Sequence, residues 1–375
     1  MDKIHEAIID ILAHPTKWNY YDSEELRKKI VETKDINNSE HCYDFIKEYI
    51  KLSDKGYYFI EEALDFFKIN EKNYDQRLCH IVSSFFLGLA LYNHESGYFS
   101  EAIRNELCAL GVFDSADDID HEFIFVWFLV CMFHDLGYVY ESLLGKDYVD
   151  TEFLKSRYCN EAKQLVEALP DFKGECAKLP KTTIPIHYEM IIENYLEYRQ
   201  NKDHGILGGL SFATKLTKLR KQKYEGDTGN LSWKPELDKL YNYVGWRICC
   251  HNIWYQRGCE SSNSGLIDYA NAGLSSLILD NKKEKNGTYK KYPINFKKHP
   301  LFFFFCLIDT IEPTKKCDGK IPDDMELDLI DGVLEISCTS EKKYINDISK
   351  SLNEWLAGTI INENKMTIYL DKKND

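Results

Sequence analysis

Residues 123–137 have the sequence FIFVWFLVCMFHDLG, in which eleven consecutive apolar residues lead directly into His134 and Asp135. A run of this length predicts a buried core helix, because a helix that crosses a bilayer needs about 20 apolar residues. The apolar run at residues 301–308, LFFFFCLI, ends in the same way, directly before Asp309. An ionisable group at the end of a buried helix is costly unless it is paired or binds a metal. The two helix ends are therefore candidate chemical sites.

Most of the chain has apolar residues at three- and four-residue intervals, the spacing typical of helices that bury one face. We therefore predict a mainly α protein. The expected helices cover residues 1–14, 23–33, 40–51, 60–68, 75–93, 119–136, 184–200, 205–221, 235–256 and 298–312.

The last sixty or so residues have a different pattern. Residues 326–337 alternate apolar and polar side chains around Asp331 and Gly332, which predicts a β-hairpin with a two-residue turn. A helix at 341–356 and a strand at 366–370 are expected to follow. The chain is therefore divided into a helical N-terminal extension, a central helical domain and a small α+β C-terminal subdomain, at residues 1–70, 71–318 and 319–375.

Composition limits the class of protein. The chain has 375 residues, 44% of them hydrophobic and 29% charged, which suits a globular protein with a large core. The 61 acidic and 47 basic residues give a net charge of −14, which argues against broad binding to duplex DNA. A nucleotide substrate stays open, because a local cation or metal can bind phosphate. The 12 cysteines form no C-x-x-C pair and no signal-peptide pattern is present, so we expect a reducing, cytoplasmic location without membrane contact.

Three expected helices carry side chains that bind metals. A third apolar helix, near residues 79–92, has His80 close to its start, in addition to the His134-Asp135 pair and Asp309. Each alone has an ordinary interpretation, since a lone histidine is often a core residue and an aspartate after an apolar run is often a helix cap. Their occurrence together on three helices favours a site for a divalent cation, which histidine and carboxylate ligands suit.

The order of these residues resembles that of a known family. His…His-Asp…Asp on successive helices is typical of the HD-domain superfamily of metal-dependent phosphohydrolases, and the resemblance covers about residues 72–315. Residues 77–80, RLCH, resemble the family's Arg-x-x-His opening, and residues 134–137, HDLG, resemble its His-Asp-apolar-Gly core. Residues 203–209, DHGILGG, resemble its His-Gly-x-x-Gly helix start, and residues 307–309, LID, its closing aspartate.

The resemblance implies an HD-type helical bundle over residues 71–318 that binds one or two divalent ions, with Mn, Fe, Mg, Ni and Co all left open. Branches of the family with two metals use additional histidines between the His-Asp pair and the last aspartate. The candidates here are His204 and His251, either of which could instead be a structural or surface histidine. The implied metal ligands are His80, His134, Asp135, His204, His251 and Asp309.

One position departs from the family pattern. Many members have a phosphate-binding Lys after the Gly, whereas this chain has Tyr138, which keeps a hydrogen-bond donor but no positive charge. Asp135 is the implied bridging ligand, and Arg77 would neutralise charge in the transition state. Glu141 could orient water or could be a solvated carboxylate on a helix face. The candidates for substrate binding are Arg77, Tyr138, Arg247, Lys315 and Lys316.

The reaction implied is hydrolysis of a phosphoester by a metal-activated hydroxide, on a nucleotide or a related phosphorylated small molecule. A nuclease for single-stranded nucleic acid, or a cyclic (oligo)nucleotide phosphodiesterase, is the alternative on the same scaffold. A non-catalytic ligand-sensing or scaffold module is the alternative of another class. The sequence leaves the oligomeric state open.

Overall fold

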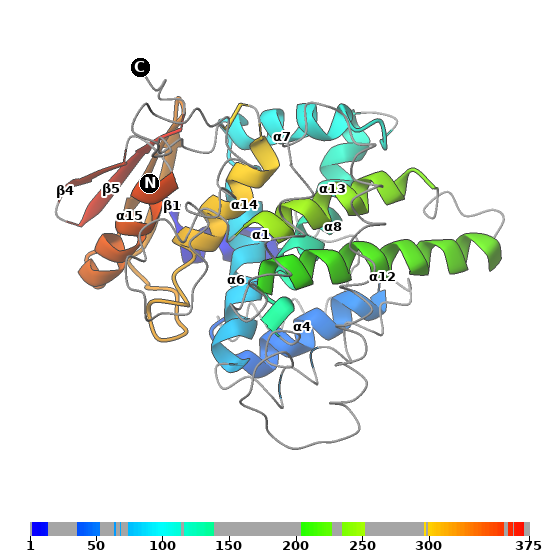
Figure 1. The fold of residues 1–375 in the computed structure, drawn as a ribbon. Helices are drawn as coiled ribbons and strands as arrows, with labels where there is room; N and C mark the ends of the chain where they lie inside the picture. Colours follow the sequence, from blue (N-terminus) through cyan, green and yellow to red (C-terminus); the bar gives the residue numbers. More distant parts are fainter. Residues whose placement is uncertain are drawn as a thin grey trace, which may run out of the picture.

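The computed structural model describes residues 2–13, 36–52, 64, 68, 74–113, 116–138, 204–226, 235–251, 296–297, 299–355, 359–362 and 364–370. Within these ranges the protein is mainly helical, with a small antiparallel sheet near the C-terminus (Figure 1). The mainly α prediction is confirmed. The helices expected at 23–33 and 184–200, and most of the one at 60–68, lie outside the described residues.

The described helices match most of the expected ones. Their bounds are α1 (Ile4–Ala13), α4 (Ser39–Leu52), α6 (Tyr74–Tyr92), α7 (Tyr98–Cys108), α8 (Ala116–His134), α12 (His204–Gly226), α13 (Leu237–Cys250), α14 (Pro300–Ile311) and α15 (Lys342–Trp355).

Helix α7 is a finding that the sequence prediction did not include. Its buried side chains are Phe99, Ile103 and Leu107, one per turn, in an otherwise polar segment. Gly97 precedes the helix with a φ of 63°, a left-handed conformation that glycine adopts without strain. The narrow apolar stripe explains why the helix was missed, because three apolar positions among polar ones are a weak periodic signal.

The sheet has five strands in the order β1-β2-β3-β5-β4, all antiparallel. The predicted hairpin is confirmed, with Ile330 opposite Val333 and the turn residues Asp331 and Gly332 at φ values of 50° and 75°. Two strands were not predicted. They are β4 and β1. Strand β1, at the start of the chain, pairs with β2 from the C-terminal region. The strands are β1 (Asp2–Lys3), β2 (Glu326–Ile330), β3 (Val333–Ser337), β4 (Thr359–Asn362) and β5 (Lys365–Tyr369).

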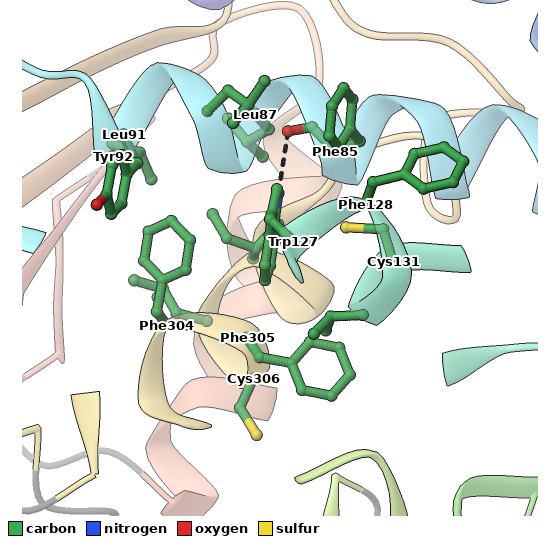
Figure 2. Packing of buried hydrophobic residues seen from close by; sticks show 14 of the residues in the cluster. Phe85, Leu87, Leu91, Tyr92, Trp127, Phe128, Cys131, Phe304, Phe305 and Cys306 are labelled. Atoms are coloured by element: carbon green, nitrogen blue, oxygen red, sulfur yellow. Dashed lines mark hydrogen bonds between the residues drawn. The ribbon is translucent and has the colours of Figure 1, made fainter. Parts of the chain in front are cut away.

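The core fixes the relative positions of α6, α8 and α14. Trp127 of α8 is fully buried, and its indole Nε1 donates a hydrogen bond to the carbonyl oxygen of Phe85 in α6 at 3.0 Å (Figure 2). A Cβ atom at Gly88 would lie 2.3 Å from the Trp127 ring, so glycine is what lets these two helices approach. The rings of Phe304 and Phe305 in α14 pack against the same indole, at centroid distances of 5.0 and 6.3 Å. These are the three helices that carry the predicted His-Asp motif.

Helices α12 and α13 form a closely packed pair that lies side by side in Figure 1. A Cβ atom at Gly209 would lie 2.2 Å from the carbonyl oxygen of Gly245, which shows how near the two backbones are. Arg220 of α12 makes a bidentate ion pair with Asp238 of α13, at 2.5 and 2.6 Å. Among the described residues, no helix has both the length and the apolar character needed to cross a membrane.

Candidate metal centre

His80 of α6, His134 at the end of α8 and Asp309 of α14 bring their side chains to one buried point. One ligand atom from each residue lies within 4.8 Å of the others. The Nε2 atom of His80 is 3.1 Å from Nε2 of His134 and 3.1 Å from Oδ1 of Asp309. The histidine side chains are 0% and 1% exposed. This group has the ligand types and the spacing to hold a metal ion.

Asp135 lies at the edge of this group. Its Oδ1 atom is 3.4 Å from Nε2 of His134 and 3.6 Å from Nε2 of His204. The Asp135 side chain is 1% exposed, and no donor in the described part of the chain makes a hydrogen bond to Oδ1. A buried carboxylate oxygen without a donor is costly, and coordination to a cation would remove that cost. The chemistry of the donor set therefore fits a bound metal.

His204 and His251 form a second pair next to the first. Their Nε2 atoms are 3.2 Å apart, and the ring centroid of His251 is 5.7 Å from that of His134. His204 is the first residue of α12, and His251 follows the last residue of α13. The structure thus brings together all six residues that the sequence singles out as metal ligands.

Two glycines allow these helix ends to meet. A Cβ atom at Gly137, two residues after Asp135, would lie 1.7 Å from the carbonyl oxygen of His204. A Cβ atom at Gly205 would lie 3.0 Å from Nδ1 of His251. A larger residue at either position would push α12 away from its neighbours, because packed backbones leave no room for added atoms.

Backbone carbonyls set the tautomers of two of the histidines. Nδ1 of His134 is 2.6 Å from the carbonyl oxygen of Cys131, and Nδ1 of His251 is 2.6 Å from that of Ile248. A carbonyl oxygen only accepts hydrogen bonds, so each Nδ1 carries the proton and each Nε2 is left with its lone pair. Both lone pairs are on the ring nitrogens that lie among the other ligand atoms.

His80 has a different partner, which the sequence analysis missed. Its Nδ1 atom is 2.6 Å from Oε2 of Glu312, and both side chains are 0% exposed. Burial lowers the pKa of His80, but the nearby Glu312 and Asp309 outweigh it and the net shift is upward. The sequence signal for Glu312 is weak, since it is only an acidic residue three positions after Asp309.

Two cations lie beside the carboxylates. Nη1 of Arg77 is 3.3 Å from Oδ2 of Asp135, and Nζ of Lys315 is 2.7 Å from Oδ1 of Asp309 and 4.0 Å from Oδ2 of Asp135. Burial alone would raise the pKa of both carboxyls, but the charge of Lys315 together with His134 and His80 outweighs it and holds the pKa of each well below its ordinary value. The two aspartates are therefore ionised at neutral pH.

The histidines of the second pair are neutral at the same pH. Burial lowers the pKa of His204 well below its usual value and that of His251 to about 4. A neutral imidazole binds metals, whereas an imidazolium has no free lone pair.

Tyr138 connects the cations to the second histidine pair. Its ring stacks on His204 at a centroid distance of 3.7 Å and an interplanar angle of 18°. The guanidinium of Arg77 lies 3.5 Å from the centre of the same ring. Two groups this close to one ring centre must lie on opposite faces, so Tyr138 is held between Arg77 and His204.

The remaining predicted residues are placed differently. Arg247 is buried and pairs with Glu106 of α7 at 2.6 Å, with its guanidinium 3.0 Å from the centre of the Tyr243 ring. The ion pair links α13 to α7, the ring contact lies within α13, and neither involves the metal-ligand group. For Lys316, burial lowers the pKa. Glu141 lies outside the described residues.

Comparison with known proteins does not add to this geometry: no protein-family model, curated protein or solved structure matches the chain. The chemistry of this site is therefore inferred from its residues and their arrangement.

Proposed function

We propose that the protein is an HD-type metal-dependent phosphohydrolase that acts on a nucleotide or a related phosphorylated small molecule. The observation that carries the proposal is the convergence of His80, His134, Asp135 and Asp309, from three different helices, at one buried point. The order of these residues along the chain is the one that the sequence resemblance requires.

The donor set supports a divalent ion of the first transition series or magnesium, because it mixes imidazole nitrogens with ionised carboxylates. The Asp135 carboxylate lies between His134 and His204, so it is the residue able to bridge two ions. When bound, such ions polarise a phosphoryl oxygen and lower the pKa of a water molecule.

Arg77 and Lys315 would bind the phosphate of the substrate. Their side chains are 17% and 32% exposed, whereas the ligand Asp135 beside them is 1% exposed. The two cations therefore lie between solvent and the buried ligands, where an entering phosphate would meet them first. Both are fixed by carboxylates, so their positive charges are positioned before substrate arrives, which favours electrostatic stabilisation of the transition state.

The charges of the site and of the chain favour a small phosphorylated substrate. A site with two fixed cations, in a chain with a net charge of −14, suits a small anion bound at one place. A polynucleotide would require a continuous basic surface.

The proposal is tested by assaying the full chain with bis-p-nitrophenyl phosphate, a nucleotide panel and a single-stranded oligonucleotide, each with added Mn²⁺, Fe²⁺, Mg²⁺, Ni²⁺ or Co²⁺. We expect metal-dependent hydrolysis of at least one nucleotide, lost in Asp135→Asn and kept in His94→Ala, whose histidine bonds Ser96 in the connection after α6. Cleavage of the oligonucleotide alone would favour a nuclease. No turnover under any of these conditions would overturn the enzyme assignment.

A further inference from the structure

Glu312 is a buried carboxylate that no part of the reaction described above uses. It is 0% exposed, and its Oε2 atom is 2.6 Å from Nδ1 of His80, on the side of the ring away from His134 and Asp309. With Nδ1–H donating to this carboxylate, the neutral form of the His80 ring has its lone pair on Nε2, the nitrogen that lies among the ligand atoms.

The carboxylate of Glu312 is itself held in place. The backbone N–H of Thr314 donates to Oε1 at 2.9 Å, and the Thr314 hydroxyl donates to Oε2 at 2.8 Å. Thr314 is fully buried as well. Each carboxylate oxygen therefore has a fixed donor, so Glu312 cannot rotate away from His80 without losing hydrogen bonds that water cannot replace.

The segment that contains Glu312 is bound to the helix that carries His80. Glu312 follows the last residue of α14, and its extended conformation, φ −61° and ψ 124°, turns the chain out of the helix. The side-chain amide of Gln76 in α6, one turn before His80, donates to the carbonyl oxygens of Thr314 and Lys315 at 3.1 and 3.0 Å. The end of α14 thus supplies both the ligand Asp309 and the carboxylate that contacts the ligand from α6.

We propose that Glu312 is a positioning residue that fixes the tautomer and orientation of His80 and makes it a stronger imidazole ligand than His134 or His251. The inference rests on the proposed function, because it requires a metal at His80. His134 and His251 donate from Nδ1 to neutral carbonyl oxygens, whereas His80 donates to a carboxylate. A carboxylate partner increases the basicity of the opposite ring nitrogen, and loss of such a partner weakens metal binding about 10- to 100-fold.

The test is the affinity of the full chain for Co²⁺ and Mn²⁺, measured by calorimetry, together with the visible absorption of the Co²⁺ form. We expect Glu312→Gln to bind about 10- to 100-fold more weakly than wild type at the same stoichiometry, with a changed Co²⁺ spectrum. The matched control is Ser84→Ala, because the Ser84 hydroxyl lies 3.5 Å from the same Nδ1 atom but carries no charge. We expect this control to bind as wild type does.

Glu312 and His80 could also stabilise the fold as a pair without any effect on a metal, so thermal unfolding of the metal-free variants is measured in parallel. Equal affinities for wild type and Glu312→Gln, whatever their stabilities, would overturn the inference and leave the metal centre standing. Absence of metal binding in wild type would overturn the proposed function too. If Glu312→Gln does not fold, the metal affinity of Thr314→Val is measured instead, because this variant loses the hydroxyl that orients Glu312. Weaker metal binding would support the inference, and unchanged binding would overturn it.

Discussion

The carbonyl oxygens of Cys131 and Ile248 control the chemistry of the two histidines that they contact. Each accepts a hydrogen bond from Nδ1 at 2.6 Å, of His134 and His251 respectively, and so leaves Nε2 as the ligand atom. Both carbonyls are three residues before their histidine, in the last turn of a helix, where a carbonyl oxygen has a lone pair left to accept a hydrogen bond from a side chain. A histidine at the end of a helix is therefore oriented by the helix itself.

The contribution of the Tyr138 ring can be separated from that of its hydroxyl by two substitutions. We expect Tyr138→Phe to keep most metal binding and activity, because the ring remains between Arg77 and His204. Tyr138→Ala removes both ring contacts, worth about 1–2 kcal/mol together, so kcat/KM should fall about 5- to 30-fold. Steady-state kinetics and metal stoichiometry of the two variants check this expectation. Equal losses in both variants would show that the hydroxyl, rather than the ring, is what matters.

At the scale of elements, the approach of α6 and α8 places His80 opposite His134. We expect Gly88→Ala to separate these helices, because the added Cβ would lie 2.3 Å from the buried Trp127 ring. Overpacking of this kind costs about 1–3 kcal/mol, so the free energy of unfolding should fall by that amount. Chemical denaturation measures the loss. Gly111→Ala is the comparison, since its Cβ meets nothing within 4 Å and only its φ of 64° is strained. A larger loss in Gly111→Ala than in Gly88→Ala would contradict the packing argument.

Asp324 connects the segment before β2 to the segment after β3. Its carboxylate accepts hydrogen bonds from the backbone N–H groups of Thr339 and Ser340, at 2.9 and 2.7 Å, and from both hydroxyls. Although burial opposes them, these bonds hold the pKa of Asp324 below its ordinary value. A lowered pKa stabilises the folded state above the unfolded pKa of about 3.9, and this stability is lost as the pH falls below it.

We therefore expect Asp324→Asn to cost about 1 kcal/mol of unfolding free energy at pH 7, a modest value because solvent screens the group. The difference between wild type and variant should shrink as the pH is lowered from 5 to 3. Urea denaturation at a series of pH values measures it. A difference that is constant with pH would show that the carboxylate charge contributes nothing.

The sequence predicts the elements whose signal is local. Residues 123–133 and 301–308 are apolar enough to require buried helices, and Asp331-Gly332 specifies a hairpin turn. Strand β1 has two residues, and its existence depends on pairing with β2 more than 300 positions away. Such long-range pairing has no periodic signal at the N-terminus, so sequence periodicity cannot reveal it.

In the whole molecule, the difference between local sequence signals and long-range contacts also applies to the candidate metal centre. His80, His134, Asp135 and Asp309 could be singled out because histidine and aspartate at the ends of apolar helices are conspicuous by residue type and order. His204 and His251 are candidates through the family resemblance. The role of Glu312 and the ion pair between Arg247 and Glu106 could not be predicted from the sequence, because each depends on which helices become neighbours. The candidate ligands are thus recognisable from local sequence, whereas the contacts that support each of them are produced by packing.

Packing also joins the two ends of the described chain to the helices of the site. Strand β1 pairs with β2, helix α1 contacts α6, and α15 contacts α14. The Tyr344 hydroxyl of α15 donates to the carbonyl oxygen of Ile311, the residue before Glu312. Helix α15, which packs on the C-terminal sheet, therefore supports the end of α14 at which Asp309 lies (Figure 1).

Elemental analysis of the purified full chain shows whether the described helices form a metal centre. After incubation with divalent metal and removal of the excess, we predict one or two ions per chain in wild type and in His94→Ala, and a large loss in His134→Ala. Wild type that holds no metal above the level of His134→Ala, for any of Mn, Fe, Mg, Ni or Co, would contradict the account.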